Sequence, residues 1–231
     1  MNGDITVVLL PGLDGTGRLF RRLVNGTPLQ FRPQVISYPC DRELDYAQLE
    51  RLVREQLTSS APYIVVGESF SGPLAVALAA RPTGALRGIV MVASFVTPPA
   101  LTVWRYLPWR LVFRFPAPAL ILRRFLMPAD AELLKNMREA LQGVSPSVLA
   151  SRVRTTLAVD ARADLAGSTV PVLYIQAKRD FVVPARCLRT IMSIREDVTV
   201  ERLDSAHPVL QLEPDAAWRV IEAFARKVNA S

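Results

Sequence analysis

Between a short apolar run and an apolar segment with a helical pattern, the chain reads Val65-Val66-Gly67-Glu68-Ser69-Phe70-Ser71-Gly72. Small residues around a serine at such a junction favour a sharp turn from a strand into a helix, which projects the serine hydroxyl above the carboxyl ends of the strands. The usual pattern of this nucleophile elbow is G-x-S-x-G, whereas here Ser71 holds the last position and Gly72 follows it. Serine is small enough to be tolerated in such a turn. The alternative interpretation is that Ser69 caps the helix that follows.

The elbow belongs to an alternation of short apolar runs and longer helical patterns, which is typical of a parallel sheet built from strand-helix units. Six runs rich in valine and isoleucine are expected to be strands: 5–10, 35–38, 63–66, 88–93, 172–176 and 199–203. Each is apolar on both faces, as a strand covered by helices on both sides should be. Helical patterns cover 46–59, 73–80, 184–194 and 215–228. We predict an α/β fold with about six mostly parallel strands and helices on both faces of the sheet.

The connection between the fourth and fifth predicted strands is too long for a simple strand-to-helix loop. Helical patterns fit there at 102–115, 130–141 and 146–157, with breaks at Pro116, Pro118 and Pro128. We expect a helical insertion folded over one edge of the sheet. Residues 1–95 and 170–231 then form the core, and residues 96–169 form the insertion.

A serine hydroxyl becomes a good nucleophile only when a base removes its proton and an acid orients that base. The single histidine, His207, follows the last predicted strand. Asp180 lies in the loop after the fifth predicted strand and precedes His207, in the chain order Ser, Asp, His. Asp204 is the rival acid because it lies close to His207 in the sequence. We predict a catalytic triad of Ser69, Asp180 and His207.

A glycine-rich turn, Leu10-Pro11-Gly12-Leu13-Asp14-Gly15-Thr16-Gly17, follows the first predicted strand. The competing interpretation, a nucleotide site, is disfavoured because neither G-x-x-x-x-G-K-[ST] nor a complete G-x-G-x-x-G is present. Such a turn can instead aim a backbone N–H at a developing oxyanion, paired with the N–H of the residue after the nucleophile. We therefore expect the backbone amides of Leu13 and Phe70 to form an oxyanion hole, and Asp14 to brace the turn or only to shape it.

Four motifs in order, LLPGLDGTG, GESFSG, PVLYIQAKRDFVVP and DSAHPVLQLEP, resemble the α/β-hydrolase superfamily over nearly the whole chain. The antiparallel hairpin that commonly precedes the first parallel strand of that superfamily has no room here, so a trimmed member is expected. The resemblance implies a serine hydrolase that cleaves carboxylic esters or thioesters through an acyl-enzyme on Ser69, with no cofactor. Two alternatives stay open: an acyltransferase that uses an acceptor other than water, and a pseudoenzyme that only binds a ligand or partner.

The insertion is similar to the cap of that superfamily, which usually sets substrate choice. On a helical wheel its first helical pattern has two apolar stripes, with arginines between them. One stripe comprises Trp104, Leu107, Leu111 and Phe115, and the other Tyr106, Trp109 and Phe113. We expect one stripe to pack on the sheet domain and the other to line an acyl pocket or meet a partner, and we assign Tyr106, Trp109 and Phe113 to the substrate pocket. The alternative is a cap helix buried on two sides.

The charge of the 231-residue chain, +7 overall, is unevenly distributed. No Asp or Glu occurs from Ser69 to Ala129, whereas that segment holds seven arginines: Arg81, Arg87, Arg105, Arg110, Arg114, Arg123 and Arg124. None of the usual nucleic-acid-binding signatures is present, so a nucleic-acid partner is not expected. A local basic surface suits an anionic substrate or a lipid headgroup, and contact with a membrane surface stays possible.

The remaining composition restricts the chemistry further. Two cysteines far apart, Cys40 and Cys187, and one histidine make a disulfide framework or a metal site unexpected. The N-terminus lacks a basic region and its apolar run is too short for the core of a signal peptide, so a cytoplasmic protein is expected. The sequence gives no indication of an oligomeric state.

Overall fold

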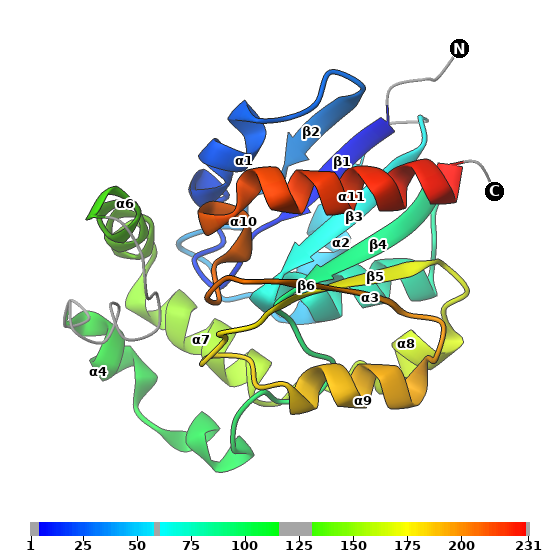
Figure 1. The fold of residues 1–231 in the computed structure, drawn as a ribbon. Coiled ribbons are helices and arrows are strands. Elements are labelled where there is room, and N and C mark those ends of the chain that lie inside the picture. Colours follow the sequence, from blue (N-terminus) through cyan, green and yellow to red (C-terminus); the bar gives the residue numbers. More distant parts are fainter. Residues whose placement is uncertain (1–4, 58–60, 116–130, 230–231) are drawn as a thin grey trace.

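The computed structural model describes residues 5–57, 61–115 and 131–229, which form one six-stranded sheet with helices on both faces (Figure 1). The strand order is β2-β1-β3-β4-β5-β6 and every neighbouring pair is parallel. The strands are β1 (Ile5–Leu10), β2 (Phe31–Val35), β3 (Tyr63–Glu68), β4 (Leu86–Val92), β5 (Val172–Ala177) and β6 (Thr199–Leu203). The predicted α/β architecture of six parallel strands is confirmed.

Helices cover the two faces of the sheet unequally (Figure 1). One face carries α2 (Tyr46–Gln56), α3 (Gly72–Ala80), α8 (Arg162–Gly167) and α9 (Arg186–Ile194), and the other α1 (Arg21–Asn25), α10 (Val209–Leu212) and α11 (Pro214–Asn229). Side chains alternate between the two faces of a strand. Val8 and Leu10 therefore pack against the helices of the first face, which include α2 and α3, whereas Val7 and Leu9 pack against those of the other face, which include α11. Two buried clusters, one on each face, fix the sheet.

The second strand differs from its prediction. The structure places it at Phe31–Val35, not at 35–38, and pairs Ile5 with Phe31 and Leu9 with Val35. Its outer edge is free of a neighbouring strand, so Pro33 and polar side chains are tolerated there. The prediction followed apolar side chains such as Ile36 and Tyr38, which are buried but lie just beyond the strand. The opposite edge strand, β6, is also largely exposed rather than apolar on both faces.

The first helix predicted in the long connection is interrupted. Residues Thr102–Tyr106 form a 3₁₀ turn, η3, and residues Trp109–Arg114 form α4. Pro108 lacks an N–H donor and disfavours helical backbone at the residue before it, so Leu107 is extended. The next predicted helices are present as α6 (Ala131–Gln142) and α7 (Pro146–Thr156). The three predicted proline breaks between α4 and α6 lie outside the described residues.

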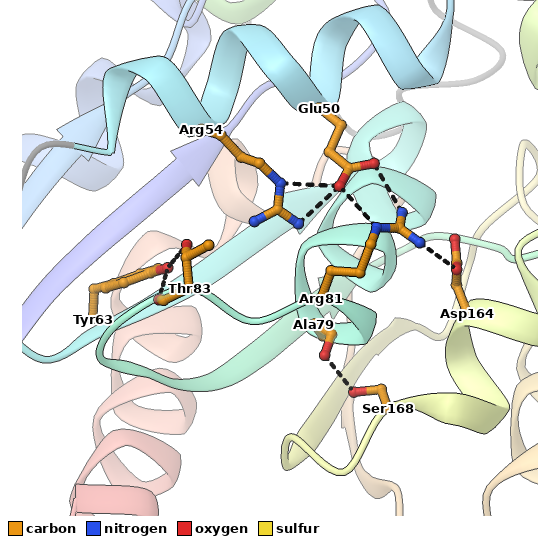
Figure 2. Close-up of polar contacts among 8 residues, drawn as sticks. All are labelled: Glu50, Arg54, Tyr63, Ala79, Arg81, Thr83, Asp164 and Ser168. Carbon is orange, nitrogen blue, oxygen red and sulfur yellow. Dashed lines mark hydrogen bonds and ion pairs between the residues drawn. The ribbon is translucent and has the colours of Figure 1, made fainter.

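The helix α8 was not predicted, and it is tied to the helices that cover the sheet. Figure 2 shows Glu50 of α2 between Arg54 and Arg81, with N–O distances of 2.8 and 2.9 Å, and Arg81 extending to Asp164 of α8 at 3.1 Å. Leu165 of α8 is fully buried in the main core cluster. The division of the chain into a core and an insertion stays a prediction, with α8 in contact with α3 and α9.

Candidate active site

The turn after β3 has the geometry of a nucleophile elbow. Ser69 adopts a positive φ of 47°, in the left-handed region that non-glycine residues rarely occupy. Gly67 and Gly72 allow the close packing around it: a Cβ at Gly67 would lie 2.6 Å from the Ser71 carbonyl oxygen, and one at Gly72 would lie 1.8 Å from Ser94 Oγ. The Ser94 hydroxyl in turn donates to the Ser69 carbonyl at 2.6 Å. The backbone thus holds Ser69 in a strained conformation supported on both sides.

Ser71, which replaces the last glycine of the usual pattern, has contacts of its own. Its side chain is fully buried and its Oγ lies 2.7 Å from the Tyr38 hydroxyl. The same Oγ donates a hydrogen bond to the Pro11 carbonyl, at the start of the glycine-rich turn. Ser71 therefore links the elbow to that turn.

The structure brings the three predicted triad side chains together. Ser69 Oγ lies 2.9 Å from His207 Nε2, and His207 Nδ1 lies 2.8 Å from Asp180 Oδ2. The other carboxylate oxygen of Asp180 accepts the N–H groups of Val182 and Val183, each at 2.8 Å. With Nδ1–H donating to a carboxylate, Nε2 is left as the acceptor for the serine proton. The chain from Asp180 to Ser69 is thus arranged for base-assisted attack by the hydroxyl.

Asp204, the rival acid, points elsewhere. Its side chain is 69% exposed and its Oδ1 lies 3.5 Å from an Arg179 guanidinium nitrogen. The structure places it directly after β6, beside Arg179, and brings the carboxylate of Asp180 to the imidazole instead.

The glycine-rich turn after β1 is held by hydrogen bonds within the turn and by hydrogen bonds from α7. Asp14 Oδ1 accepts the backbone N–H of Thr16 at 2.8 Å, and Gly15 and Gly17 have φ values of 68° and 71°, which glycine adopts without strain. From α7, the buried Arg152 guanidinium donates to the carbonyls of Leu13 and Asp14 at 2.9 and 2.6 Å. It also donates to the Pro39 carbonyl at 2.9 Å. The position of Leu13 is therefore set by a residue that the sequence did not single out.

A cavity of about 320 Å³ opens beside Ser69 and His207. Leu13 and Phe70, the two expected oxyanion donors, both lie on its wall. Most of the other lining side chains are apolar: Leu19, Phe95, Pro99, Met137, Leu141, Val153, Leu157, Val182, Val183 and Pro208. Met137 and Leu141 lie in α6. Val153 lies in α7, and Leu157 is the residue that follows α7. The sequence did not single out these four residues. Their apolar spacing along the two predicted helices is the pattern from which they could have been found.

The structure brings none of the three predicted pocket aromatics to this cavity. Phe113 is half-buried and packs on a cluster of Val144, Val148 and Leu149, and the Trp109 ring lies 6.1 Å from it. Tyr106 is exposed. The interruption at Pro108 ends the continuous helical wheel, and within the stripe assigned to the pocket it is Phe113 that packs on Val148 and Leu149 of α7.

Two buried carboxyl groups lie in the cavity wall. Glu68, the residue before the nucleophile, is 6% exposed, and its Oε2 accepts a hydrogen bond from Gln211 Nε2 at 3.1 Å. Burial raises the pKa of Glu68 to about 7, although the Gln211 hydrogen bond and the nearby His207 act in the opposite direction. Burial also raises the pKa of Asp14. Burial therefore raises the pKa of both carboxyl groups in the cavity wall.

Within residues 5–57, 61–115 and 131–229, no group of three or more His, Cys, Asp or Glu side chains is placed to hold a metal ion. Cys40 and Cys187 are both free thiols, and burial raises the pKa of Cys187.

Comparison with solved structures identifies the same fold in several hydrolases. The enol-lactonase from Burkholderia xenovorans LB400 superposes with a TM-score of 0.79 at 17% identity, over 97% of this chain and 92% of that one. A carboxylesterase from the ammonia-oxidizing thaumarchaeon Nitrososphaera gargenis superposes with a TM-score of 0.79 at 16% identity, over 100% of this chain and 93% of that one. An N-formylmaleamic acid deformylase from Pseudomonas putida S16 superposes with a TM-score of 0.70 at 17% identity, over 94% of this chain and 91% of that one.

No curated protein sequence is significantly similar to the chain. A family model described as the alpha/beta hydrolase family matches residues 7–220, which include most of β1, the turn after β3, Asp180 and His207. The match spans nearly the whole sheet. The chain therefore belongs to the alpha/beta hydrolase family.

Proposed function

We propose that this hydrolase cleaves carboxylic esters or thioesters through an acyl-enzyme on Ser69. The observation that carries the proposal is the hydrogen-bonded chain from Asp180 through His207 to Ser69, which ends at an apolar cavity. A structural serine cap would need neither a histidine at 2.9 Å nor a cavity beside its hydroxyl.

In the proposed reaction, His207 Nε2 takes the proton of the Ser69 hydroxyl as Oγ attacks the substrate carbonyl carbon. The carbonyl oxygen becomes an oxyanion, which accepts hydrogen bonds from the backbone amides of Leu13 and Phe70. Collapse of this intermediate breaks the bond to the alcohol or thiol, which leaves with the proton from His207. Asp180 stays ionised and stabilises the imidazolium in both steps.

Water then attacks the acyl-Ser69 carbonyl carbon, and His207 takes one proton of that water. The second intermediate collapses to release the carboxylic acid, and the proton returns to Ser69 Oγ. If an alcohol or amine reaches the acyl group instead of water, the same residues transfer the acyl group to that acceptor. Hydrolysis and acyl transfer therefore share the first half of the mechanism.

The cavity favours a small, apolar acyl or alcohol group. Its volume of about 320 Å³ lies at the lower end of the roughly 300–1,000 Å³ that ligand pockets occupy. Two of the structurally similar proteins are described by their names as acting on esters, a lactonase and a carboxylesterase, while a third is a deformylase. An ester or thioester is the substrate class proposed here, and an amide is the competitor to be tested.

A fluorophosphonate probe tests the nucleophile directly. We expect it to modify the wild-type protein stoichiometrically and to leave Ser69→Ala unlabelled, because the elbow and His207 activate that hydroxyl. Ser193→Ala, which changes an exposed serine of α9, is the control and should label like the wild type. Equal labelling of Ser69→Ala would exclude Ser69 as the nucleophile and favour the pseudoenzyme alternative.

A substrate panel tests the bond that is cleaved. Esters, thioesters and amides with the same acyl group are compared over increasing acyl length, with and without an added alcohol acceptor. We expect ester and thioester turnover to fall once the acyl chain exceeds the cavity, and amide turnover to be much lower. Product that carries the added alcohol would assign the protein to acyl transfer.

A further inference from the structure

Residues 101–115 carry an exposed apolar surface, here called the cap patch. Of the thirteen large apolar side chains that are exposed in the part of the chain that the structure describes, eight lie in these residues. Within the cap patch, Leu101, Tyr106 and Phe115 are the most exposed, at 67%, 73% and 69%. Such a concentration is unusual for a surface that faces only water.

Seven apolar side chains make up the two stripes of this segment, and among them only Trp109 and Phe113 are half-buried. Trp109 and Phe113 are half-buried on the side of α7, which lies between α4 and the sheet (Figure 1). The other stripe, which includes Trp104, Leu107 and Leu111, is exposed. The interruption at Pro108 lets η3 and α4 both present this stripe to solvent.

The charge of the cap patch has a single sign. Arg105, Arg110 and Arg114 are exposed, and none forms an ion pair with a described carboxylate. Arg105 lies over the Tyr106 ring at 4.7 Å from its centroid and donates to its hydroxyl. Elsewhere in the fold, exposed arginines such as Arg81 and Arg162 do pair with carboxylates. With no Asp or Glu from Ser69 to Ala129, the cap patch suits a negatively charged partner.

The cap patch begins next to the cavity. Pro99, two residues before Leu101, lines the cavity, and its carbonyl accepts a hydrogen bond from Arg186 of α9. Val182, which is 39% exposed, lines the same cavity. A partner seated on the cap patch would therefore lie close to the residues at the cavity rim.

We propose that the cap patch docks this hydrolase on the surface of an anionic lipid bilayer. Protruding Trp, Tyr, Leu and Phe side chains enter the boundary between headgroups and acyl chains, where aromatic rings with a polar edge are stabilised. The three arginines contact lipid phosphates at the same level, since no described carboxylate neutralises their charge. No described helix has the length and apolar character needed to cross a bilayer, so this contact is with the surface.

Vesicle flotation of the Ser69→Ala variant tests the docking without relying on the proposed activity. We expect binding to phosphatidylcholine vesicles that contain phosphatidylglycerol, little binding to phosphatidylcholine alone, and release by salt. Arg110→Gln with Arg114→Gln should weaken binding on the order of 25-fold, from about 5-fold for each arginine near the surface. The matched control, Arg51→Gln with Arg87→Gln, removes the same charge from exposed positions outside the cap patch and should weaken it far less.

The apolar contribution is tested with Leu107→Ser and Leu111→Ser, whose side chains are exposed and contribute little to the core. This pair should weaken binding by about tenfold or more, whereas Leu29→Ser with Met192→Ser, also exposed, should leave it unchanged. Absence of binding to anionic vesicles, or equal losses in the cap patch and control variants, would overturn the proposal. Self-association that these variants abolish, without vesicle binding, would assign the surface to a second copy of the chain.

Discussion

Arg152 of α7 donates a hydrogen bond from its guanidinium to the carbonyl of Leu13, the residue whose amide is proposed to stabilise the oxyanion. The side chain is 3% exposed, and its acceptors are backbone carbonyls rather than a carboxylate. Burial lowers the pKa of Arg152, with Asp14 acting in the opposite direction, yet the group stays a cation at neutral pH. A charged group used in this way fixes the path of the turn rather than binding a counterion.

Replacing Arg152 with Met should therefore lower kcat with little change in KM. Met fills much of the same volume but donates nothing, so the Leu13 amide is no longer held for the oxyanion. We expect kcat to fall by about tenfold to a hundredfold for a proposed ester substrate. Steady-state kinetics well below the melting temperature separate this effect from lost stability.

The control for that experiment is Arg154→Gln, on the same helix. Arg154 is partly exposed and its guanidinium lies 3.8 Å from Glu43, so its replacement should leave kcat almost unchanged. A normal kcat in Arg152→Met together with a lowered melting temperature would restrict Arg152 to a structural role.

Replacing Asp180 with Asn should lower turnover by on the order of 10⁴, by analogy with other serine hydrolase triads. The asparagine carbonyl can still accept the amides of Val182 and Val183, so the loop keeps its shape while the oxygen facing His207 is lost. Asp204→Asn, which alters only an exposed pair with Arg179, is the control and should retain nearly full turnover. The opposite ranking of the two variants would give the acid role to Asp204.

Replacing Gly72 with Ala should disable the elbow through a single contact. The added Cβ would lie 1.8 Å from Ser94 Oγ and 2.6 Å from Ser94 Cβ, which the buried site cannot relieve without moving the Ser69 backbone. We expect loss of most fluorophosphonate labelling and a lower melting temperature. Adding Ser94→Gly to Gly72→Ala removes both clashing atoms and should restore part of the labelling, although the bond to the Ser69 carbonyl is lost.

The control for this pair is Gly167→Ala at the end of α8. A Cβ there meets no atom within 4 Å, so labelling and melting temperature should match the wild type. If Gly72→Ala also labels normally, Gly72 and Ser94 can move apart without disturbing Ser69, and the close contact between them is not required for the elbow.

The elbow and the order of the triad residues were predictable because each depends on local sequence. Gly67, Ser69 and Gly72 lie within one turn, and His207 and Asp180 each follow a run of strand-forming residues. The position of β2 was not predictable in the same way. An edge strand pairs on one side only, so its sequence can carry Arg32 and Pro33 and lose the apolar signal on which the prediction relied.

The cavity walls were harder to predict because they depend on how distant helices pack. The pocket assignment of Trp109 and Phe113 assumed one unbroken helix, but Leu107 is extended before Pro108 and the Phe113 ring packs on Val148 and Leu149 of α7. Arg152 gave no signal at all, since an arginine in a helix is usually a solvated residue. Its role is visible only once α7 is placed against the turn after β1.

Replacing Glu68 with Gln should stabilise the protein by an amount that depends on pH. Burial raises the pKa of Glu68 from 4.5 to about 7. Between these two pH values the carboxyl is therefore protonated in the folded protein but ionised in the unfolded chain. The contribution of the protonated carboxyl is fully present below pH 4.5 and is lost as pH rises through about 7. The isosteric Gln carries no charge to bury, and its side-chain carbonyl can still accept the hydrogen bond from Gln211.

We therefore expect the difference in unfolding free energy between Glu68→Gln and the wild type to grow from pH 4.5 to pH 7 and to level off above it. A pKa difference from 4.5 to about 7 corresponds to a change of about 3 kcal/mol in the unfolding free energy. Urea unfolding of both proteins at a series of pH values measures it, and Glu132→Gln, which removes a carboxylate exposed on α6, is the control with little pH dependence. If the difference in unfolding free energy between Glu68→Gln and the wild type did not change with pH, the carboxyl would ionise in the folded protein as it does in water. The cavity wall at Glu68 would then be better solvated than its burial implies.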